Sequence, residues 1–218
     1  MNQHISKNGC IWVAPIYGGQ SPATTPFYLE YLGDGCSSEV LHKGVIFISK
    51  NIGKVFEQNW KNSCPDNIFY YRPPDAAQSF GENSSLRFSA KSPCDCFMFN
   101  GKILYTLELK SVKTKSISFE RTKEDKGVIH KHQIDSLKKF SSYKNVISGF
   151  LFDFRLSDMT YFCSIKEFIN MTDNLDKKSF NEKDLLEQCN PIKIEKKKLK
   201  VNYRYNIEHF LQITSKGD

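Results

Sequence analysis

The spacing of apolar residues predicts a first long helix just after residue 49. Its inward stripe recurs at i, i+3, i+4, i+7 and i+8 and consists of Ile52, Val55, Phe56, Asn59 and Trp60. Ser49 or Asn51 can cap the start, because their side-chain oxygens accept hydrogen bonds from the first free N–H groups of a helix. Pro65 lies just beyond the predicted end.

Three further helices are predicted by similar patterns. Residues 130–143 carry an inward stripe of Ile134, Leu137 and Phe140. The segment S-I-K-E at 164–167 has the capping-box pattern and opens a short helix to about residue 171. A last helix is expected over 182–189, after Asn181.

Extended apolar stretches predict strands between these helices, at residues 68–71, 93–110, 145–154 and 159–163. The stretch 145–154 is apolar on both of its alternating faces, which is typical of a strand that is covered on both sides. The order of helices and strands predicts an α/β domain with a central mixed β-sheet flanked by helices.

Composition divides the chain into three segments. Residues 1–48 are rich in Gly, Pro, Ser and Tyr without a helical period, and we expect an N-terminal extension. Residues 49–171 hold the elements of the predicted α/β domain. Residues 172–218 form a helical and basic C-terminal segment.

Residues 93–110, with the sequence PCDCFMFNGKILYTLELK, predict a β-hairpin around Asn100-Gly101. This dipeptide tolerates the positive φ that both central positions of a type I′ turn require. A two-residue turn pairs Asp95 with Thr106 across the hairpin. It makes Asp95 and Glu108 diagonal neighbours, with Cα atoms roughly 7–8 Å apart.

One face of this hairpin carries candidate chemistry, because side chains alternate between the two faces of a strand. Asp95, Glu108 and Lys110 lie on the same face, whereas the intervening residues point into an apolar layer: Ile103, Tyr105, Leu107 and Leu109. Two carboxylates at this spacing can hold one Mg²⁺, which prefers oxygen ligands and keeps several waters. A neighbouring lysine can orient a water and stabilise charge that develops on a phosphate. The alternative is an ordinary strand whose Glu and Lys face solvent.

The charge of the chain favours a polyanionic partner, with nucleic acid first. The formal net charge is +7, and it resides in the body of the chain, since residues 1–48 contain two lysines and three acids. Two basic segments are candidate DNA contacts: one holds Lys113, Lys115 and Arg121, and the other holds Lys196, Lys197 and Lys198. A solvated loop and a flexible basic tail are the alternatives.

Targeting signals are not evident. The seven cysteines have irregular spacings, and the N-terminus has no basic region followed by an apolar run, so reduced thiols in a cytoplasm are expected. No apolar stretch approaches the length of about 18 residues that a membrane span requires. We expect no structural zinc site and interpret His130 and His132 as surface residues.

Four short motifs, taken in order, resemble the PD-(D/E)xK nuclease superfamily and, within it, the RecU-type Holliday junction resolvases of bacteria and their phages. The motifs are an N-x-G-x-x-x-E helix at Asn51–Glu57, an aspartate at Asp95, E-x-K at Glu108–Lys110, and an H-x-H-Q-like helix start at His130–Gln133. The resemblance covers about residues 50 to 171.

This resemblance implies a restriction-endonuclease-like fold in which Asp95 and Glu108 bind Mg²⁺ or Mn²⁺ and Lys110 orients the attacking water. It also implies supporting roles for Glu57 and Gln133, and a projecting stalk at residues 76–92. Family members are cytoplasmic homodimers that cut two strands of a four-way DNA junction symmetrically in recombination and repair. Two alternatives remain open: a restriction- or repair-type nuclease that cuts duplex DNA, and a non-catalytic DNA-binding accessory protein.

Overall fold

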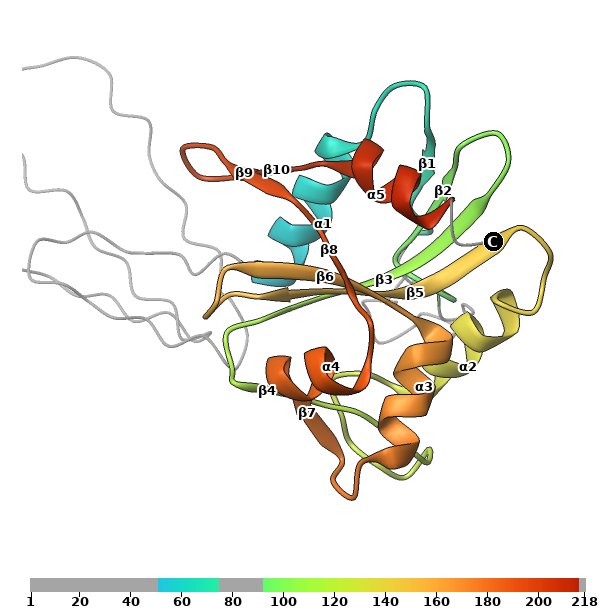
Figure 1. Ribbon diagram of the computed structural model, residues 1–218, viewed down its shortest axis with the longest axis vertical. Coiled ribbons are helices and arrows are strands. Elements are labelled where there is room, and N and C mark those ends of the chain that lie inside the picture. The colour runs from blue at the N-terminus through green and yellow to red at the C-terminus, as the bar shows by residue number, and fades with distance from the viewer. Residues whose placement is uncertain (1–50, 75–91, 216–218) are drawn as a thin grey trace, which may run out of the picture. The chain divides into compact units, whose positions relative to one another are not determined.

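The computed structural model describes residues 51–74 and 92–215 (Figure 1). The described residues all belong to one compact unit, which begins at Asn51. The predicted N-terminal extension, and the predicted stalk up to residue 91, lie outside the described residues.

The helices and strands alternate along the chain much as the sequence predicts. Those before the central strand β5 (Val146–Phe154) are α1 (Ile52–Ser63), β1 (Phe69–Tyr71), β2 (Cys96–Phe99), β3 (Leu104–Val112), β4 (Ser116–Ser118) and α2 (Lys131–Phe140). Those after it are β6 (Met159–Ser164), α3 (Ile165–Asn174), β7 (Ser179–Asn181), α4 (Glu182–Gln188), β8 (Ile192–Lys193), β9 (Lys196–Lys198), β10 (Tyr203–Tyr205) and α5 (Ile207–Thr214).

The central sheet is mixed and has the strand order β1-β2-β3-β5-β6-β8. Strands β3 and β5 are parallel and pair along their whole length, from Leu104 with Val146 to Val112 with Phe154. The other neighbours in this sheet are antiparallel. The parallel pair requires a crossover, which contains β4 and α2.

Helices cover both faces of the sheet, and each face has its own apolar core (Figure 1). On one face, α1 and α5 pack Phe56, Trp60 and Phe210 against Tyr105 and other side chains of the sheet. On the other face, α2, α3 and α4 enclose a core that includes Phe150 and Phe152, and hence β5 is apolar on both sides. The predicted fold class, an α/β domain with a central mixed sheet flanked by helices, is confirmed.

The predicted capping residues at the starts of three helices are confirmed. The Asn51 side chain accepts hydrogen bonds from the N–H groups of Gly53 and Lys54 at the start of α1. Ser164 accepts from Glu167 N–H at the start of α3, and Asn181 accepts from Asp184 N–H at the start of α4. No helix within the described residues has the length and hydrophobicity that a membrane crossing requires.

The turn of the β2–β3 hairpin differs from the prediction. Phe99 pairs with Leu104, so four residues connect the strands instead of two, and only Gly101 has a positive φ. The Asn100 side chain accepts hydrogen bonds from the N–H groups of Lys102 and Ile103, which closes this longer loop without a type I′ turn. The register shifts by two residues, an even number, and therefore Asp95 and Glu108 stay on the same face.

The C-terminal segment is not a flexible basic tail. Strands β9 and β10 form an antiparallel hairpin, and Tyr205 N–H donates to the Ser63 hydroxyl at the end of α1 at 2.9 Å. Strand β8 pairs with β6 in the central sheet, and α5 contributes to the core beside α1. The C-terminal segment therefore contributes to the same sheet and core as the elements before residue 171, and the predicted boundary there stays a prediction.

Candidate active site

Two carboxyl groups meet on the sheet face that α2 covers. Asp95 immediately precedes β2, and its N–H donates to Leu107 O at 3.1 Å, which continues the hairpin register. This register places Asp95 directly opposite Glu108 on β3. The Asp95 Oδ2 atom accepts from Leu109 N–H at 2.7 Å, so the backbone of β3 fixes its side chain. Glu108 is only 2 % exposed.

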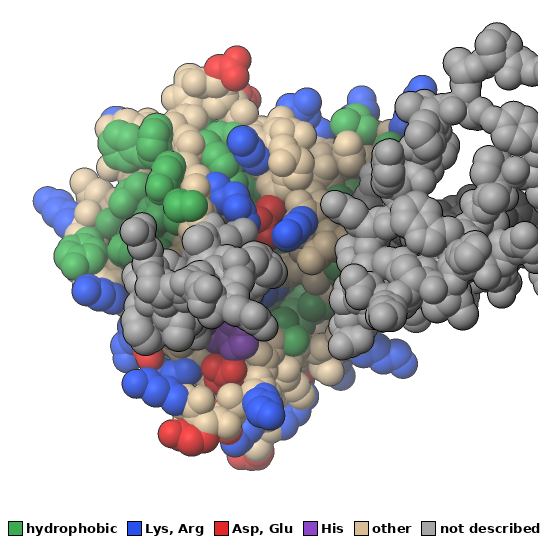
Figure 2. Space-filling view, turned by 180° about the vertical axis from the view of Figure 1, so that it is seen from behind, with side chains coloured by type: hydrophobic (Ala, Val, Ile, Leu, Met, Phe, Trp, Pro, Cys, Tyr) green, Lys and Arg blue, Asp and Glu red, His purple; other side chains and the backbone are tan. Residues whose placement is uncertain are grey.

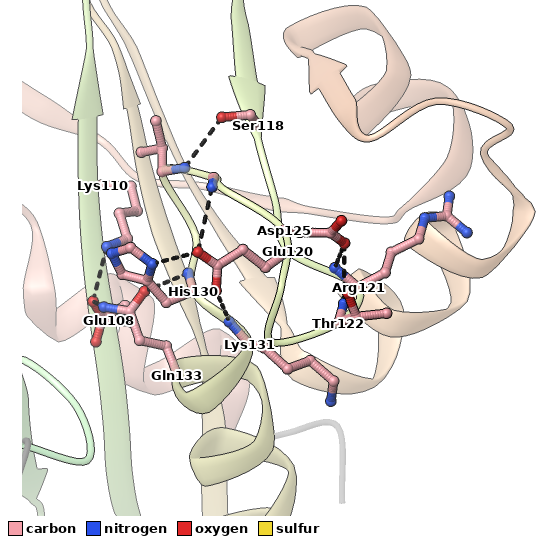
Figure 3. A network of polar contacts seen from close by, with 12 residues as sticks. Glu108, Lys110, Ser118, Glu120, Arg121, Thr122, Asp125, His130, Lys131 and Gln133 are labelled. Atoms are coloured by element: carbon pink, nitrogen blue, oxygen red, sulfur yellow. Dashed lines mark hydrogen bonds and ion pairs between the residues drawn. The ribbon is translucent and has the colours of Figure 1, made fainter.

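Two nitrogen groups hold Glu108 from different elements (Figure 3). Lys110, two residues further along β3, places Nζ 3.0 Å from Glu108 Oε1. Gln133, in the first turn of α2, donates from Nε2 to the same oxygen. The structure thus brings together four of the five predicted catalytic residues: Asp95, Glu108, Lys110 and Gln133.

The buried surroundings of Asp95 and Glu108 disfavour a negative charge on both carboxyls at the same time. Burial is the main cause that raises the pKa of Glu108 to about 8, and the neighbouring Asp95 raises it further, whereas Lys110 lowers it. Burial also raises the pKa of Asp95, against the Leu109 N–H and Lys110, which lower it. A cation between the two carboxyls would relieve both costs.

The donor set fits a hard divalent cation. The two carboxyls also hydrogen-bond to each other, and a divalent cation bound by both would replace the proton that they share. In the described residues no third His, Cys, Asp or Glu completes a cluster with them. Mg²⁺ is commonly held by one or two carboxylates together with waters and substrate phosphates, so two carboxylates are sufficient here. A zinc site would require more nitrogen or sulfur ligands than residues 51–74 and 92–215 offer at this position.

Glu57 does not join the contacts around Glu108. It lies on α1, and Arg72 Nε contacts its Oε2 at 2.9 Å. The Arg72 charge reaches the site electrostatically, since it lowers the pKa of Asp95. The supporting role of Glu57 that the family resemblance implies stays a prediction.

The predicted DNA contacts fall into two groups. Lys113, Lys115, Lys197 and Lys198 have exposed side chains. Lys and Arg side chains are spread over the face shown in Figure 2, with scattered acidic side chains among them. Such a surface suits a polyanion.

Lys196 and Arg121 have structural partners instead. The Lys196 side chain is 8 % exposed and lies 3.2 Å from Asp153 and 2.8 Å from Asp158. Its contact with DNA stays a prediction. Arg121 is exposed, but its guanidinium donates to the carbonyl oxygens of Leu175 and Lys177, which ties its loop to the end of α3.

One residue beside the site is missed by the sequence pattern. Glu120 accepts hydrogen bonds from His130 and from Lys131 N–H at the start of α2, the helix that carries Gln133 (Figure 3). The same segment contains two other acidic residues, Glu124 and Asp125. No sequence motif identifies Glu120 as the one that contacts the helix. Only the bridge between Phe119 and Ile129 brings it next to the helix.

The raised pKa of Glu108 predicts how stability depends on pH in the metal-free protein. In the folded protein the Glu108 carboxyl has a pKa of about 8 and stays protonated below that pH. An unperturbed glutamate has a pKa of 4.5 and is already ionised there. Between these values the unfolded state binds fewer protons, so the free energy of unfolding should fall as the pH rises, on the order of 4 kcal/mol in total. Urea denaturation in EDTA at pH 5 and pH 8 measures this loss.

Glu108→Gln is the matched control, because it has a similar shape and no titrating proton. The variant should lose less stability between pH 5 and pH 8, and Asp95, whose pKa is also raised, accounts for the remaining loss. An equal loss in both proteins would contradict the assignment to Glu108.

No protein-family model matches the chain. The SPbeta prophage-derived uncharacterized protein YotM of Bacillus subtilis (strain 168) is 38 % identical over 123 residues, which are 56 % of this chain. The match spans 60 % of the length of that protein.

Among solved structures, the chain is similar to Hjc, a Holliday junction resolvase of the archaeal hyperthermophile Archaeoglobus fulgidus. The TM-score is 0.38 at 13 % identity, and the match covers 64 % of this chain and 90 % of that chain. A likeness of this degree carries no argument about function. The proposal below therefore depends on the site geometry.

Proposed function

We propose that the protein is a metal-dependent, structure-specific DNA endonuclease that resolves Holliday junctions by paired symmetric cleavage. The observation that carries this proposal is the buried Asp95–Glu108 pair, with Lys110 and Gln133 both directed at Glu108. A protein that only binds DNA gains nothing from two buried carboxyls, because burying them costs free energy and they offer no positive charge to a phosphate.

The proposed roles follow from the contacts. Asp95 and Glu108 hold Mg²⁺ or Mn²⁺, which when bound supplies Lewis-acid activation of the phosphate and lowers the pKa of a water. Leu109 N–H orients the Asp95 carboxylate. Gln133 Nε2 orients Glu108, and Lys110 Nζ neutralises part of the Glu108 charge and faces the phosphate. Glu57 supports the site through Arg72.

The proposed assembly is a homodimer on DNA. A two-fold dimer presents two identical active sites to two symmetric strands, and this is how a junction can be cut in pairs. The exposed lysines Lys113, Lys115, Lys197 and Lys198 contact the DNA backbone in this proposal. A phage origin and action inside a bacterial cell complete it, supported by the prophage-derived name of the YotM relative.

The test is a cleavage assay of the full chain with Mg²⁺ on a mobile four-way junction beside a linear duplex of matched sequence. Paired symmetric nicks in the junction alone are expected. Cleavage of the duplex as well would keep the site but reassign the protein to the restriction or repair nucleases. Tight binding without cleavage in Mg²⁺ and Mn²⁺ would favour a DNA-binding accessory protein.

A further inference from the structure

The Glu120 carboxylate contacts three nitrogen atoms near the start of α2, namely two backbone N–H groups and one ring nitrogen (Figure 3). Its Oε1 atom lies 2.8 Å from His130 Nδ1 and accepts from Gly127 N–H at 3.3 Å, and its Oε2 atom accepts from Lys131 N–H at 2.8 Å. The side chain is 11 % exposed. His130 and the Lys131 N–H lower its pKa, so the carboxylate is ionised at neutral pH.

This carboxylate completes the N-terminus of a helix to which it does not belong. The first turn of α2 contains no acidic residue of its own. The free N–H groups at a helix N-terminus carry partial positive charge and favour a nearby anion. Glu120 supplies that anion from the other end of the loop, and its own N–H donates to Ile129 O at 2.9 Å, which closes the loop.

The same helical turn fixes Gln133. His130 N–H donates to Gln133 Oε1 at 3.0 Å, so the amide oxygen is engaged and the amide nitrogen is directed at Glu108. Exchanging the positions of the oxygen and nitrogen of the Gln133 side-chain amide would break both hydrogen bonds. A continuous series of contacts therefore connects Glu120, through the backbone and ring of His130, to Gln133 and then to Glu108.

We infer that Glu120 is a positioning residue of the proposed metal site, which holds the first turn of α2 so that Gln133 fixes the Glu108 carboxylate for a divalent cation. The inference rests on the proposed function and adds to it a residue outside the carboxyl pair and the two residues, Lys110 and Gln133, that contact it. Loss of Glu120 should act on the metal only through Gln133.

Asp125 provides a matched control in the same loop. It accepts from the N–H groups of Arg121 and Thr122, and its Oδ1 lies 2.6 Å from Lys178 Nζ. It thus makes the same kinds of bonds as Glu120, and none of these bonds reaches α2. Asp125→Ala should cost stability without changing metal affinity.

The experiment is a double-mutant cycle on the full chain with Mn²⁺ alone as the probe. Glu120→Ala and Gln133→Ala should each weaken Mn²⁺ binding, measured by calorimetry, by about 10–100-fold, the usual effect of removing a group that orients a ligand. The double variant should bind within about threefold of Gln133→Ala, since non-additivity is expected when one residue acts through the other. Single-turnover cleavage should follow the same pattern, with unchanged DNA affinity.

Glu120→Gln keeps an oxygen for the Lys131 N–H and should recover part of the lost affinity. If circular dichroism and thermal unfolding show that Glu120→Ala does not fold, Glu120→Gln takes its place in the double-mutant cycle. A merely structural role for Glu120 would not give this ranking of Mn²⁺ affinities.

The possible results separate the inference from the proposed function. Additive losses in the double variant, or an equal loss of affinity in Asp125→Ala, would overturn the role of Glu120 while leaving the nuclease intact. A wild-type protein that neither binds Mn²⁺ nor cuts DNA would overturn the proposed function, and the inference with it. Loss in both single variants without further loss in the double variant supports the inference.

Discussion

Asp95→Asn should reduce DNA cleavage by about 10³-fold or more, which corresponds to about 4 kcal/mol in the activation free energy. The substitution removes the charge of one of the two proposed metal ligands. The asparagine oxygen can still accept the Leu109 N–H, so the hairpin should keep its conformation. Removal of a buried negative charge beside a phosphate should leave DNA affinity unchanged or increase it.

Single-turnover cleavage of a labelled junction and electrophoretic mobility shift measure the two effects. Asp173→Asn on the exposed side of α3 is the matched control, because it makes the same change of charge away from the site. If Asp95→Asn cut at the wild-type rate, the assigned site would be refuted.

Lys110→Met should lower the single-turnover rate by about 10²–10³-fold, the typical effect of removing one group that stabilises charge in a transition state. Methionine has nearly the length of lysine and fits the partly buried position, in which the lysine side chain is 15 % exposed. The loss should persist at saturating Mg²⁺, because Lys110 is proposed to act on the phosphate and on Glu108, not to bind the cation.

Titration of the cleavage rate with Mg²⁺ separates these possibilities. Lys102→Met, an exposed lysine in the loop of the same hairpin, should retain the wild-type rate. A Lys110→Met variant whose rate returned to the wild-type value at high Mg²⁺ would show that the lysine serves metal affinity alone.

The sequence predicts the carboxyl pair because the face of a strand depends only on whether a position is odd or even. The predicted partner of Asp95 was Thr106, and the observed register places Asp95 opposite Glu108. The two registers differ by two residues, so both give the same face. Hydrophobic alternation therefore predicts the face of a side chain with more certainty than the neighbour across the strand.

Residues that depend on contacts across long separations in sequence could not be assigned from sequence. Lys196 belongs to a run of lysines, and only the pairing of β6 with β8 shows that it lies against Asp153 and not in solvent. Glu120 acquires its position from a bridge between Phe119 and Ile129, which no local pattern encodes. Gln133 could be identified only through the family resemblance, since periodicity places it at the edge of the helix stripe.

The four-residue loop between β2 and β3 has a consequence for sequence variation in this protein's relatives. A residue inserted between Asn100 and Ile103 can lengthen the loop and leave the pairing of Phe99 with Leu104 unchanged. A slip of the pairing by one residue would instead place Asp95 opposite Leu107 or Leu109 and turn it away from Glu108. Among relatives that retain the chemistry, we therefore expect the loop length to vary while the pairing of the aspartate with its glutamate is retained.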